Sequence, residues 1–232
     1  MSGVQAVVYI VDDDPSVRSA LGRLVRAAGY RAETLATGGE FLGRPRAEGP
    51  GCLVLDVRMP GPSGLDLQEA LAATGEELPV IFLTGHGDVP MTARAMKAGA
   101  VDFLTKPVNR RDLLDAIQRA VARHVRARTA RAERRALERR LATLSRRERE
   151  VFPLVVTGLL NKQIAYELGI TGGTVKVHRG RVMQKMRVGS LAELVHLAER
   201  LAVSLPHDAP SAPTPRHTTG GQAPPAARER AR

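Results

Sequence analysis

The stretch VVYIVDDDPSVR, residues 7–18, decides the fold of the first half of the chain. Its first five residues are apolar and mostly β-branched, which predicts a strand that is buried on both faces. Asp12, Asp13 and Asp14 follow at the end of this strand, and a helical pattern begins directly after them at Pro15. The fold must therefore explain why three carboxylates gather at the end of a buried strand.

The same alternation of strand and helix continues through the first half of the chain. Continuous apolar strands separated by helices predict an α/β fold with a doubly wound five-stranded parallel sheet and helices on both faces. In such sheets the binding crevice lies at the carboxyl ends of the strands, where the three aspartates are. After residues 7–11 the strand-like runs are 31–35, 52–55, 79–83 and 101–104, and the helical patterns are 15–28, 38–42, 64–73, 89–98 and one from Arg110.

Charge divides the chain into two halves. The net charge is +11 over 232 residues, yet residues 1–108 carry 10 basic and 13 acidic side chains, whereas residues 109–232 carry 25 and 11. An acidic first half and a basic second half predict two modules with different partners. A basic module is typical of nucleic-acid binding, although a solvated basic surface fits this composition equally well.

The sequence also excludes some classes of protein. No apolar run is long enough to cross a bilayer, and no signal peptide is expected. The single cysteine, Cys52, rules out a disulfide framework within the chain. We therefore expect a cytoplasmic protein without a membrane partner, in which Cys52 is a small buried hydrophobe.

The second half is predicted to be helical. Residues 112–142 contain no turn residue and predict one or two exposed linker helices, either solvated or paired with another chain. Ser145 and Glu148 have the spacing of a capping box, and Pro153 is expected to interrupt or kink the helix that follows. Further helical patterns lie at residues 162–168, 173–186 and 191–201. After Pro206 almost no large apolar residue remains, which predicts a disordered tail. The expected domains are residues 1–122, a linker at 123–143, a helical domain at 144–205 and the tail at 206–232.

A second predicted strand also ends in a carboxylate. Asp56 follows the apolar run in LVLDVRMPGPSGLDL. The first and third strands of a parallel sheet can be neighbours, so Asp12, Asp13 and Asp56 would meet at one edge. Carboxylates held this close repel each other unless a cation joins them. A hard divalent ion that prefers oxygen ligands, most plausibly Mg²⁺, fits this group and also binds phosphate oxygens.

Two further strand ends complete a candidate site for phosphoryl transfer. Thr84 ends the fourth predicted strand and Lys106 follows the fifth. A carboxylate nucleophile at Asp56, surrounded by a hydroxyl, an ammonium and a metal, is suited to accept a phosphoryl group. Each part alone has an ordinary explanation as a helix cap, a strand-end turn or a surface turn, and His86 is expected to be a loop residue. Because the ends of four predicted strands all carry groups suited to phosphoryl transfer, together they favour a phosphoryl-transfer site over these ordinary explanations.

These residues resemble the receiver domain of two-component response regulators over residues 7–122. The stretch TGHGDVPMTARAMKAGAVDFLTKP resembles the FixJ-like subgroup in particular. The resemblance implies a flavodoxin-like fold with Asp56 as the phosphate acceptor. The residues that carry it are Asp12, Asp13, Asp56 with Met59, Pro60 and Gly64 behind it, Thr84, Phe103, Lys106 and Pro107.

The resemblance also implies roles for individual residues. Asp13 and Asp56 would ligate Mg²⁺ directly and Asp12 would help through water, while Arg58 would contribute its backbone carbonyl. Thr84 and Phe103 would move together when the acceptor is phosphorylated. The peptide bond between Lys106 and Pro107 would be cis.

The stretch LNKQIAYELGITGGTVKVHRGRVMQKM, residues 160–186, predicts a helix, a tight turn and a second helix. Ala165 is small where the helices would cross, Gly169 supplies the turn and Thr171 caps the second helix, with Ile170 and Val175 packed inward. The second helix is basic and fits the major groove of DNA with its cations on phosphates. A small helical bundle with a basic face is the alternative. The expected DNA contacts are Lys162, Thr174, Lys176, His178, Arg179 and Lys185.

Residues 144–202 resemble the helix-turn-helix domain of the FixJ, NarL and LuxR type. Members often carry Pro-Arg or a similar pair where this chain has Gly172 and Gly173, which leaves the preferred DNA sequence open. Together the two resemblances imply a non-enzymatic, cytoplasmic response regulator. A sensor histidine kinase would phosphorylate Asp56, and the receiver would then dimerise and free the helix-turn-helix to bind duplex promoter DNA, with RNA polymerase as a candidate partner.

Two alternatives belong to other classes. An aspartate-dependent phosphohydrolase would use the same metal chemistry, but those enzymes have an Asp-x-Asp nucleophile motif on the first strand. Here Asp14 is followed by Pro15, and Asp56 lies on the third predicted strand. A constitutive DNA-binding protein with a silent receiver is the second alternative. The intact set of acidic residues, Thr84 and Lys106 argues against it.

Overall fold

The computed structural model describes residues 5–75, 77–85 and 89–201. It divides into two compact units, Met1–Ala136 and Leu137–Arg232. This division falls inside the linker predicted at residues 123–143, where one helix rather than two is found. The predicted disordered tail and His86 lie outside the described residues. Among the helices of these ranges, none is long and apolar enough to cross a membrane.

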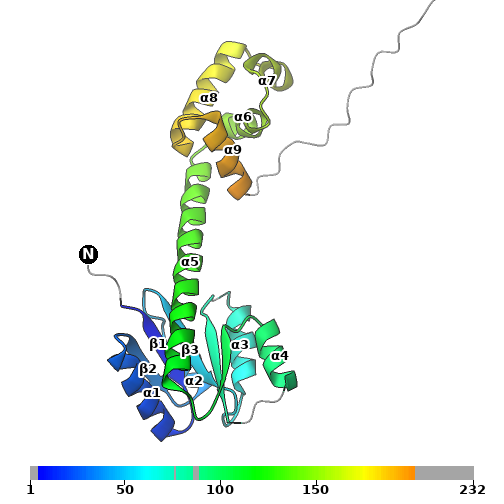
Figure 1. The fold of residues 1–232 in the computed structure, drawn as a ribbon. Coiled ribbons are helices and arrows are strands. Elements are labelled where there is room, and N and C mark those ends of the chain that lie inside the picture. The colour runs from blue at the N-terminus through cyan, green and yellow to red at the C-terminus, as the bar shows by residue number, and fades with distance from the viewer. Residues whose placement is uncertain (1–4, 76, 86–88, 202–232) are drawn as a thin grey trace, which may run out of the picture. The chain divides into compact units, whose positions relative to one another are not determined.

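The first unit has the predicted α/β fold (Figure 1). Five parallel strands form one sheet in the order β2-β1-β3-β4-β5. The bounds of the elements differ from the predicted ones by at most one residue. The strands are β1 Val7–Val11, β2 Arg31–Leu35, β3 Gly51–Asp56, β4 Val80–Thr84 and β5 Asp102–Thr105, and the helices are α1 Pro15–Ala27, α2 Gly38–Leu42, α3 Gly64–Ala73, α4 Val89–Lys97 and α5 Arg110–Ala142.

Helices cover both faces of this sheet because alternate strand residues face two separate apolar layers. Tyr9 and Val11 of β1 belong to one layer, together with buried residues of α2, α3 and α4. Val8 and Ile10 belong to the other layer, together with buried residues of α1 and α5. Figure 1 shows the strands between these two groups of helices. The central strands are covered on both sides, so their ends carry the polar groups.

Gly64 at the start of α3 allows the backbone to pack closely behind the end of β3. A Cβ atom at this position would lie 2.3 Å from the carbonyl oxygen of Asp56 and 3.1 Å from the Cα atom of Val57. The Gly64 N–H donates to the Val57 carbonyl at 3.0 Å. Only glycine tolerates such an approach of backbone to backbone, so the turn after Asp56 depends on this residue.

Cys52 lies within β3 and is fully buried, which confirms the prediction of a small hydrophobe. Its layer includes Val8 and Val54. Burial raises the pKa of the Cys52 thiol to about 12 because the apolar surroundings disfavour the thiolate. The thiol therefore stays protonated at neutral pH.

The second unit is a small helical domain around one apolar core. The Ser145 and Glu148 capping box is present at the start of α6, and Gly169 ends α7 in the left-handed conformation with φ 64°. Thr171 caps α8 by accepting from the Thr174 N–H at 3.2 Å. These three predictions are confirmed. The helices are α6 Arg146–Val156, α7 Asn161–Leu168, α8 Gly172–Met186 and α9 Leu191–Arg200.

Pro153 does not interrupt α6, contrary to one of the two outcomes predicted for it. The helix continues through Pro153 to Val156. Val151, Phe152 and Val155 beside it are buried in the core of the second unit. Burial of each large apolar side chain contributes about 1.5–3 kcal/mol, which together offsets the cost of about 3 kcal/mol for proline inside a helix.

Candidate functional site

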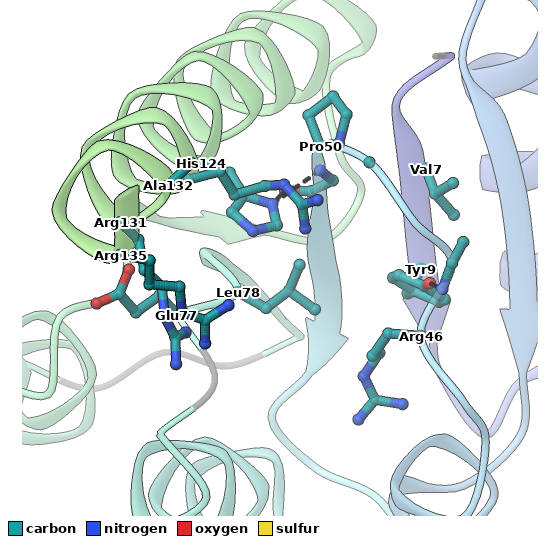
Figure 2. A pocket seen from close by; sticks show the side chains of 14 residues that line it. Val7, Tyr9, Arg46, Pro50, Glu77, Leu78, His124, Arg131, Ala132 and Arg135 are labelled. Carbon is teal, nitrogen blue, oxygen red and sulfur yellow. Dashed lines mark hydrogen bonds between the residues drawn. The ribbon is translucent and has the colours of Figure 1, made fainter. Parts of the chain in front are cut away.

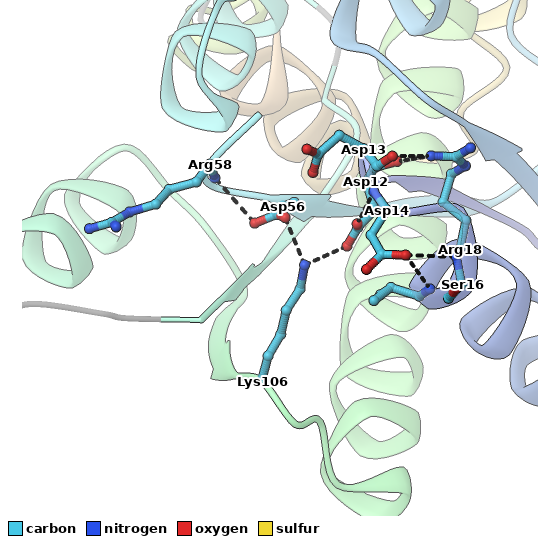
Figure 3. A network of polar contacts seen from close by, with 9 residues as sticks. Asp12, Asp13, Asp14, Ser16, Arg18, Asp56, Arg58 and Lys106 are labelled. Carbon is cyan, nitrogen blue, oxygen red and sulfur yellow. Dashed lines mark hydrogen bonds and ion pairs between the residues drawn. The ribbon is translucent and has the colours of Figure 1, made fainter. Parts of the chain in front are cut away.

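The carboxyl edge of the sheet gathers the acidic residues that the sequence singled out. β1 and β3 are parallel neighbours in register, so Asp12 directly after β1 lies beside Asp56 at the end of β3. Both are buried, at 1% and 6% exposure, whereas Asp13 is exposed. One carboxylate oxygen from each of Asp12, Asp13 and Asp56 lies within 4.8 Å of the others. Figure 3 shows these side chains converging from two strand ends.

Asp14 has a different role from its two neighbours. Its carboxylate accepts from the N–H groups of Ser16 at 2.7 Å and Val17 at 3.3 Å, and so caps α1. Its own N–H donates to Asp12 at 3.0 Å. The three consecutive aspartates therefore serve two purposes, since Asp14 starts the helix while Asp12 and Asp13 face Asp56.

Lys106 connects the two buried carboxylates. Its Nζ lies 2.6 Å from an Asp12 oxygen and 2.7 Å from an Asp56 oxygen (Figure 3). Burial by itself would lower the pKa of the Lys106 ammonium, but the hydrogen bonds to Asp12 and Asp56 outweigh it and raise this pKa. Lys106 therefore keeps its positive charge in the site. The Lys106–Pro107 bond is cis, as predicted.

The excess negative charge of the site favours the binding of a divalent cation. Burial raises the pKa of the Asp12 carboxyl, and the hydrogen bonds from Lys106 and the Asp14 N–H only partly oppose this shift. Three carboxylates face one ammonium, so two negative charges remain when all three are ionised. Closely spaced oxygen donors with this excess charge match the preference of hard divalent ions. The residues present therefore fit a bound metal.

The remaining predicted residues of the first unit lie around this group. Asp56 accepts from the Arg58 N–H at 3.1 Å, which brings the Arg58 backbone to the site. Thr84 is fully buried at the end of β4, and its carbonyl accepts from the Lys106 N–H at 2.7 Å. Phe103 in β5 is half-buried, with its ring centroid 6.1 Å from that of Phe82.

Arg18 belongs to this site although the sequence did not single it out. Its guanidinium donates to the backbone carbonyls of Asp12 at 2.6 Å and Asp13 at 2.8 Å. These bonds fix the loop that carries the acidic pair. Arg18 is one of several arginines on α1, and no spacing rule distinguishes it from those that face solvent.

The residues predicted to contact DNA lie on α7 and α8. Lys162, Thr174 and Lys176 are exposed, and His178 and Arg179 are partly exposed. Thr174 shares a hydrogen bond of 2.8 Å with the Thr171 hydroxyl. Arg179 donates to Asn161 at 3.3 Å and thereby links α8 to α7. Within the described residues the buried Nδ1 of His178 has no hydrogen-bond partner.

Lys185 differs from the other predicted DNA contacts because its ammonium is engaged within the domain. Its Nζ lies 2.6 Å from the buried carboxylate of Glu148 and donates to the Thr143 carbonyl at 3.0 Å. The hydrogen bond from Lys185 lowers the pKa of Glu148, and the Ser145 N–H adds to this effect. Lys185 therefore holds α8 against the capping box of α6.

Comparison with known proteins identifies both units. Residues 8–118 match the response regulator receiver domain, and residues 142–198 match the luxR family of bacterial regulatory proteins. Nodulation protein W of Bradyrhizobium diazoefficiens is 47% identical over 89% of this chain and 91% of its own length. The transcriptional regulatory protein FixJ of Azorhizobium caulinodans is 42% identical over 87% of this chain and 96% of its own.

A solved structure is similar along both units. The response regulator StyR is 51% identical and superimposes with a TM-score of 0.78, over 85% of this chain and all of StyR. Receiver domains imply a sensor kinase partner and bind Mg²⁺ at an acidic pocket, and the luxR-type domain implies DNA binding. The family is not enzymatic, so the phosphohydrolase alternative is wrong. The chain belongs to the family of two-component response regulators that regulate transcription through a receiver domain and a LuxR-type DNA-binding domain.

Proposed function

We propose that Asp56 is the phosphate acceptor of this response regulator. An oxygen of its carboxylate forms a bond to phosphorus while the P–N bond of a kinase phosphohistidine breaks. The electron pair of that bond returns to the imidazole nitrogen, which takes up a proton. The observation that carries this proposal is the arrangement around Asp56, with Lys106 Nζ at 2.7 Å and the acidic pair within 4.8 Å.

Each neighbour of Asp56 has a task in this proposal. Asp12, Asp13 and Asp56, with the backbone carbonyl of Arg58, would hold Mg²⁺. The ion, when bound, would offset the negative charge that gathers on the phosphoryl oxygens. The ammonium of Lys106 pairs with a phosphoryl oxygen. Arg18 keeps the acidic loop in place through the two carbonyls that it contacts.

We further propose that the phosphoryl group changes the first unit through Thr84 and Phe103. A ligand shifts an equilibrium only when it binds one state better than the other. The Thr84 hydroxyl and the Lys106 ammonium provide such contacts, and Phe103 turns inward with Thr84. The phosphorylated form then dimerises through residues 89–104, where Val89 and Met96 of α4 are 83% and 45% exposed.

In the second unit we propose that α8 reads promoter DNA in the cytoplasm. Lys176, His178 and Arg179 lie on this helix, and Thr174 lies in its first turn. Lys162 at the start of α7 contacts a phosphate. We assign Lys185 to the stability of the domain rather than to DNA because its charge is paired with Glu148. Contact of the bound dimer with RNA polymerase would complete the regulation of transcription.

Phosphorylation of the intact protein tests the proposal. The chain is incubated with acetyl phosphate and Mg²⁺, and its intact mass is followed. One phosphoryl group is expected on the wild type and on Asp115→Asn, whose carboxylate on α5 is exposed, and none on Asp56→Asn. Chelation of divalent ions by EDTA should also prevent the modification.

Binding to a selected promoter fragment then separates this proposal from a silent receiver. Phosphorylated wild type should bind more tightly and sediment as a dimer. In the intact-mass experiment, phosphorylation of Asp56→Asn to the same extent as the wild type would refute the assignment of Asp56 as the acceptor. Equal DNA affinity and an unchanged monomer mass after full phosphorylation would instead show a constitutive DNA-binding protein.

A further inference from the structure

A second polar site lies in the first unit at the amino-terminal edge of the sheet, away from the aspartates. A cavity of about 280 Å³ opens there between the first residues of β1 and β3 and one side of α5 (Figure 2). Val7, Gly51 and Leu78 form part of its wall. We propose that this cavity binds a small anion with two or more phosphate or carboxylate groups.

The charges that line the cavity favour such an anion. Arg128, Arg131 and Arg135 follow His124 along α5 at spacings that place all four side chains on one helix face, and all four line the cavity. Within the described residues, no carboxylate lies within 4.0 Å of these three guanidinium groups. Like charges on one helix face repel each other, and a bound anion would remove this repulsion.

A fourth guanidinium on the opposite wall is held in place by the protein. Arg46 lies with its guanidinium carbon 3.8 Å from the ring centroid of Phe41 and donates to the Phe41 and Arg44 carbonyls at 2.6 and 2.7 Å. Glu77 also lines the cavity, near Arg131 and Arg135 in Figure 2. Among the described residues that line the cavity, the three arginines of α5 outnumber the single carboxylate of Glu77, while Arg46 is fixed in position by its own contacts.

His124 adds a polar group that is tied to the sheet. Its Nδ1 lies 2.9 Å from both the backbone nitrogen and the carbonyl oxygen of Gly51. Burial lowers the pKa of His124, and the nearby charge of Arg128 lowers it further, against the opposing effects of Gly51 and Glu77. The ring is therefore neutral at neutral pH. When its Nδ1 accepts from the Gly51 N–H, the hydrogen is on Nε2, which can donate to an anion.

The chemistry of the lining selects the class of ligand. The guanidinium group of arginine can donate two parallel hydrogen bonds to the oxygens of a phosphate or carboxylate group. The cavity volume of about 280 Å³ lies just below the range of about 300–1,000 Å³ that is typical of ligand pockets, so a compact anion fits better than a large cofactor. Inorganic pyrophosphate is a suitable probe for the phosphate class, and citrate is a suitable probe for the carboxylate class.

The test needs a readout at the cavity itself, because the basic second unit can also attract anions. The ¹⁵N-labelled full-length protein is titrated with pyrophosphate, and separately with citrate, without divalent cations. The Gly51 amide and the His124 ring are followed by NMR. The double variant Arg128→Gln/Arg131→Gln removes two cavity charges. Arg126→Gln removes one exposed charge from α5 outside the cavity lining and serves as the control.

A saturable shift of the Gly51 amide in the wild type is expected with at least one probe. The double variant should weaken binding about tenfold, which corresponds to about 1.4 kcal/mol, and the control should change it less than about twofold. If the double variant loses helix content, the single change Arg135→Gln replaces it, with a loss of about threefold expected.

Two results would overturn the proposal. One is the lack of a saturable shift at Gly51 and His124 with both probes at millimolar concentration. The other is equal weakening by the cavity variants and by Arg126→Gln, which would indicate a general attraction to the basic helix. Tighter binding of pyrophosphate than of citrate would support the phosphate class, and the reverse order would support the carboxylate class.

Discussion

The acidic site of the first unit and the basic surface of the second unit arrange their charges in opposite ways. Asp12 and Asp56 are buried and share the single ammonium of Lys106. Lys162 and Lys176 are exposed, and within the described residues they form no ion pair. A charge in the first site depends on its neighbours, whereas a charge on the second surface is solvated and nearly independent.

This difference has consequences for how each region responds to substitution. In a buried group the loss of one partner leaves another charge unpaired, so effects are large and not additive. On an exposed surface each cation adds a small contribution to phosphate binding that salt screens. The comparison therefore predicts strong single-site effects in the receiver and graded, salt-dependent effects in the DNA-binding domain.

Replacement of Lys106 by Met should give the largest effect. The variant leaves Asp12 and Asp56 without their shared cation and removes the partner of the phosphoryl oxygens, so phosphorylation by acetyl phosphate should slow about 10²-fold or more. The rate is measured by intact mass at saturating Mg²⁺. The control variant Arg23→Met removes an exposed cation of α1, outside the proposed dimer surface, and should react at the wild-type rate. A Lys106→Met rate within twofold of wild type would contradict the proposed role.

The Glu148–Lys185 pair should give the next largest effect, because the Glu148 carboxylate is buried in the second unit while the Lys185 side chain is 34% exposed. Glu148→Gln should destabilise this unit by about 2 kcal/mol, as a charged hydrogen bond is replaced by a weaker one. Hydrogen exchange of α6 amides in the full-length protein measures the change. Glu150→Gln is the control, because Glu150 pairs with the exposed Arg146 and Arg147, and its effect on stability should be much smaller than that of Glu148→Gln. Equal losses of stability in Glu148→Gln and Glu150→Gln would show that the burial of Glu148 does not strengthen its pair with Lys185.

The same pair predicts a pH dependence. The pKa of Glu148 is lowered below its ordinary value of 4.5 in the folded protein. Its contribution is therefore complete above pH 4.5 and is lost as the pH falls below 4.5 through the folded-state pKa. Between pH 6 and pH 3, α6 in the wild type should lose more protection than α6 in Glu148→Gln. Parallel pH profiles for the two proteins would show that Glu148 is not the titrating group.

Single substitutions on α8 should have moderate effects on DNA affinity. Lys176→Ala and Arg179→Ala should each cost about 1–2 kcal/mol at a selected site, and a loss confined to that site would identify a base contact. Fluorescence anisotropy at two salt concentrations, with selected and scrambled duplexes, separates base contacts from phosphate contacts. Lys185→Met should leave DNA affinity unchanged once the protein is folded. Should both alanine variants bind with wild-type affinity and salt slope, α8 would not be the reading helix.

The cap of α8 should give the smallest effect. Thr171→Ala removes the hydroxyl that accepts from the Thr174 N–H and should destabilise the second unit by about 1 kcal/mol. Thr171→Ser keeps the hydroxyl and should stay within about 0.3 kcal/mol of wild type. Hydrogen exchange of the first turn of α8 provides the measurement. Equal destabilisation by both changes would indicate that the Thr171 methyl group, rather than the cap, is important.

Local patterns were sufficient to predict the elements of both units. Five apolar runs and their intervening helices gave the sheet to within one residue, because burial on two faces requires continuous apolar strands. The convergence of Asp12, Asp56 and Lys106 followed from the same argument, since parallel strands present their ends at one edge. The division of tasks between Asp14 and its neighbours did not follow, because one sequence pattern fits a helix cap and a metal ligand equally well.

Contacts between distant segments could not be predicted from spacing. Arg18 binds two carbonyls of the acidic loop, and Lys185 pairs with Glu148, yet each looks like any other basic residue on an amphipathic helix. The continuation of α6 through Pro153 depends on burial of its neighbours, which only the folded domain reveals. The cavity beside α5 likewise arises from residues on four separate segments.

The burial of Cys52 makes this chain convenient for site-specific spectroscopy. It is the single cysteine of the sequence, and a thiol with a pKa of about 12 inside the sheet reacts very slowly with maleimides or iodoacetamides. Cysteines introduced at exposed positions would therefore react with a fluorophore or a spin label while Cys52 stays unlabelled. Labels on α4 and on α9 could then report, in the same protein background, distances within and between molecules as the acceptor is phosphorylated.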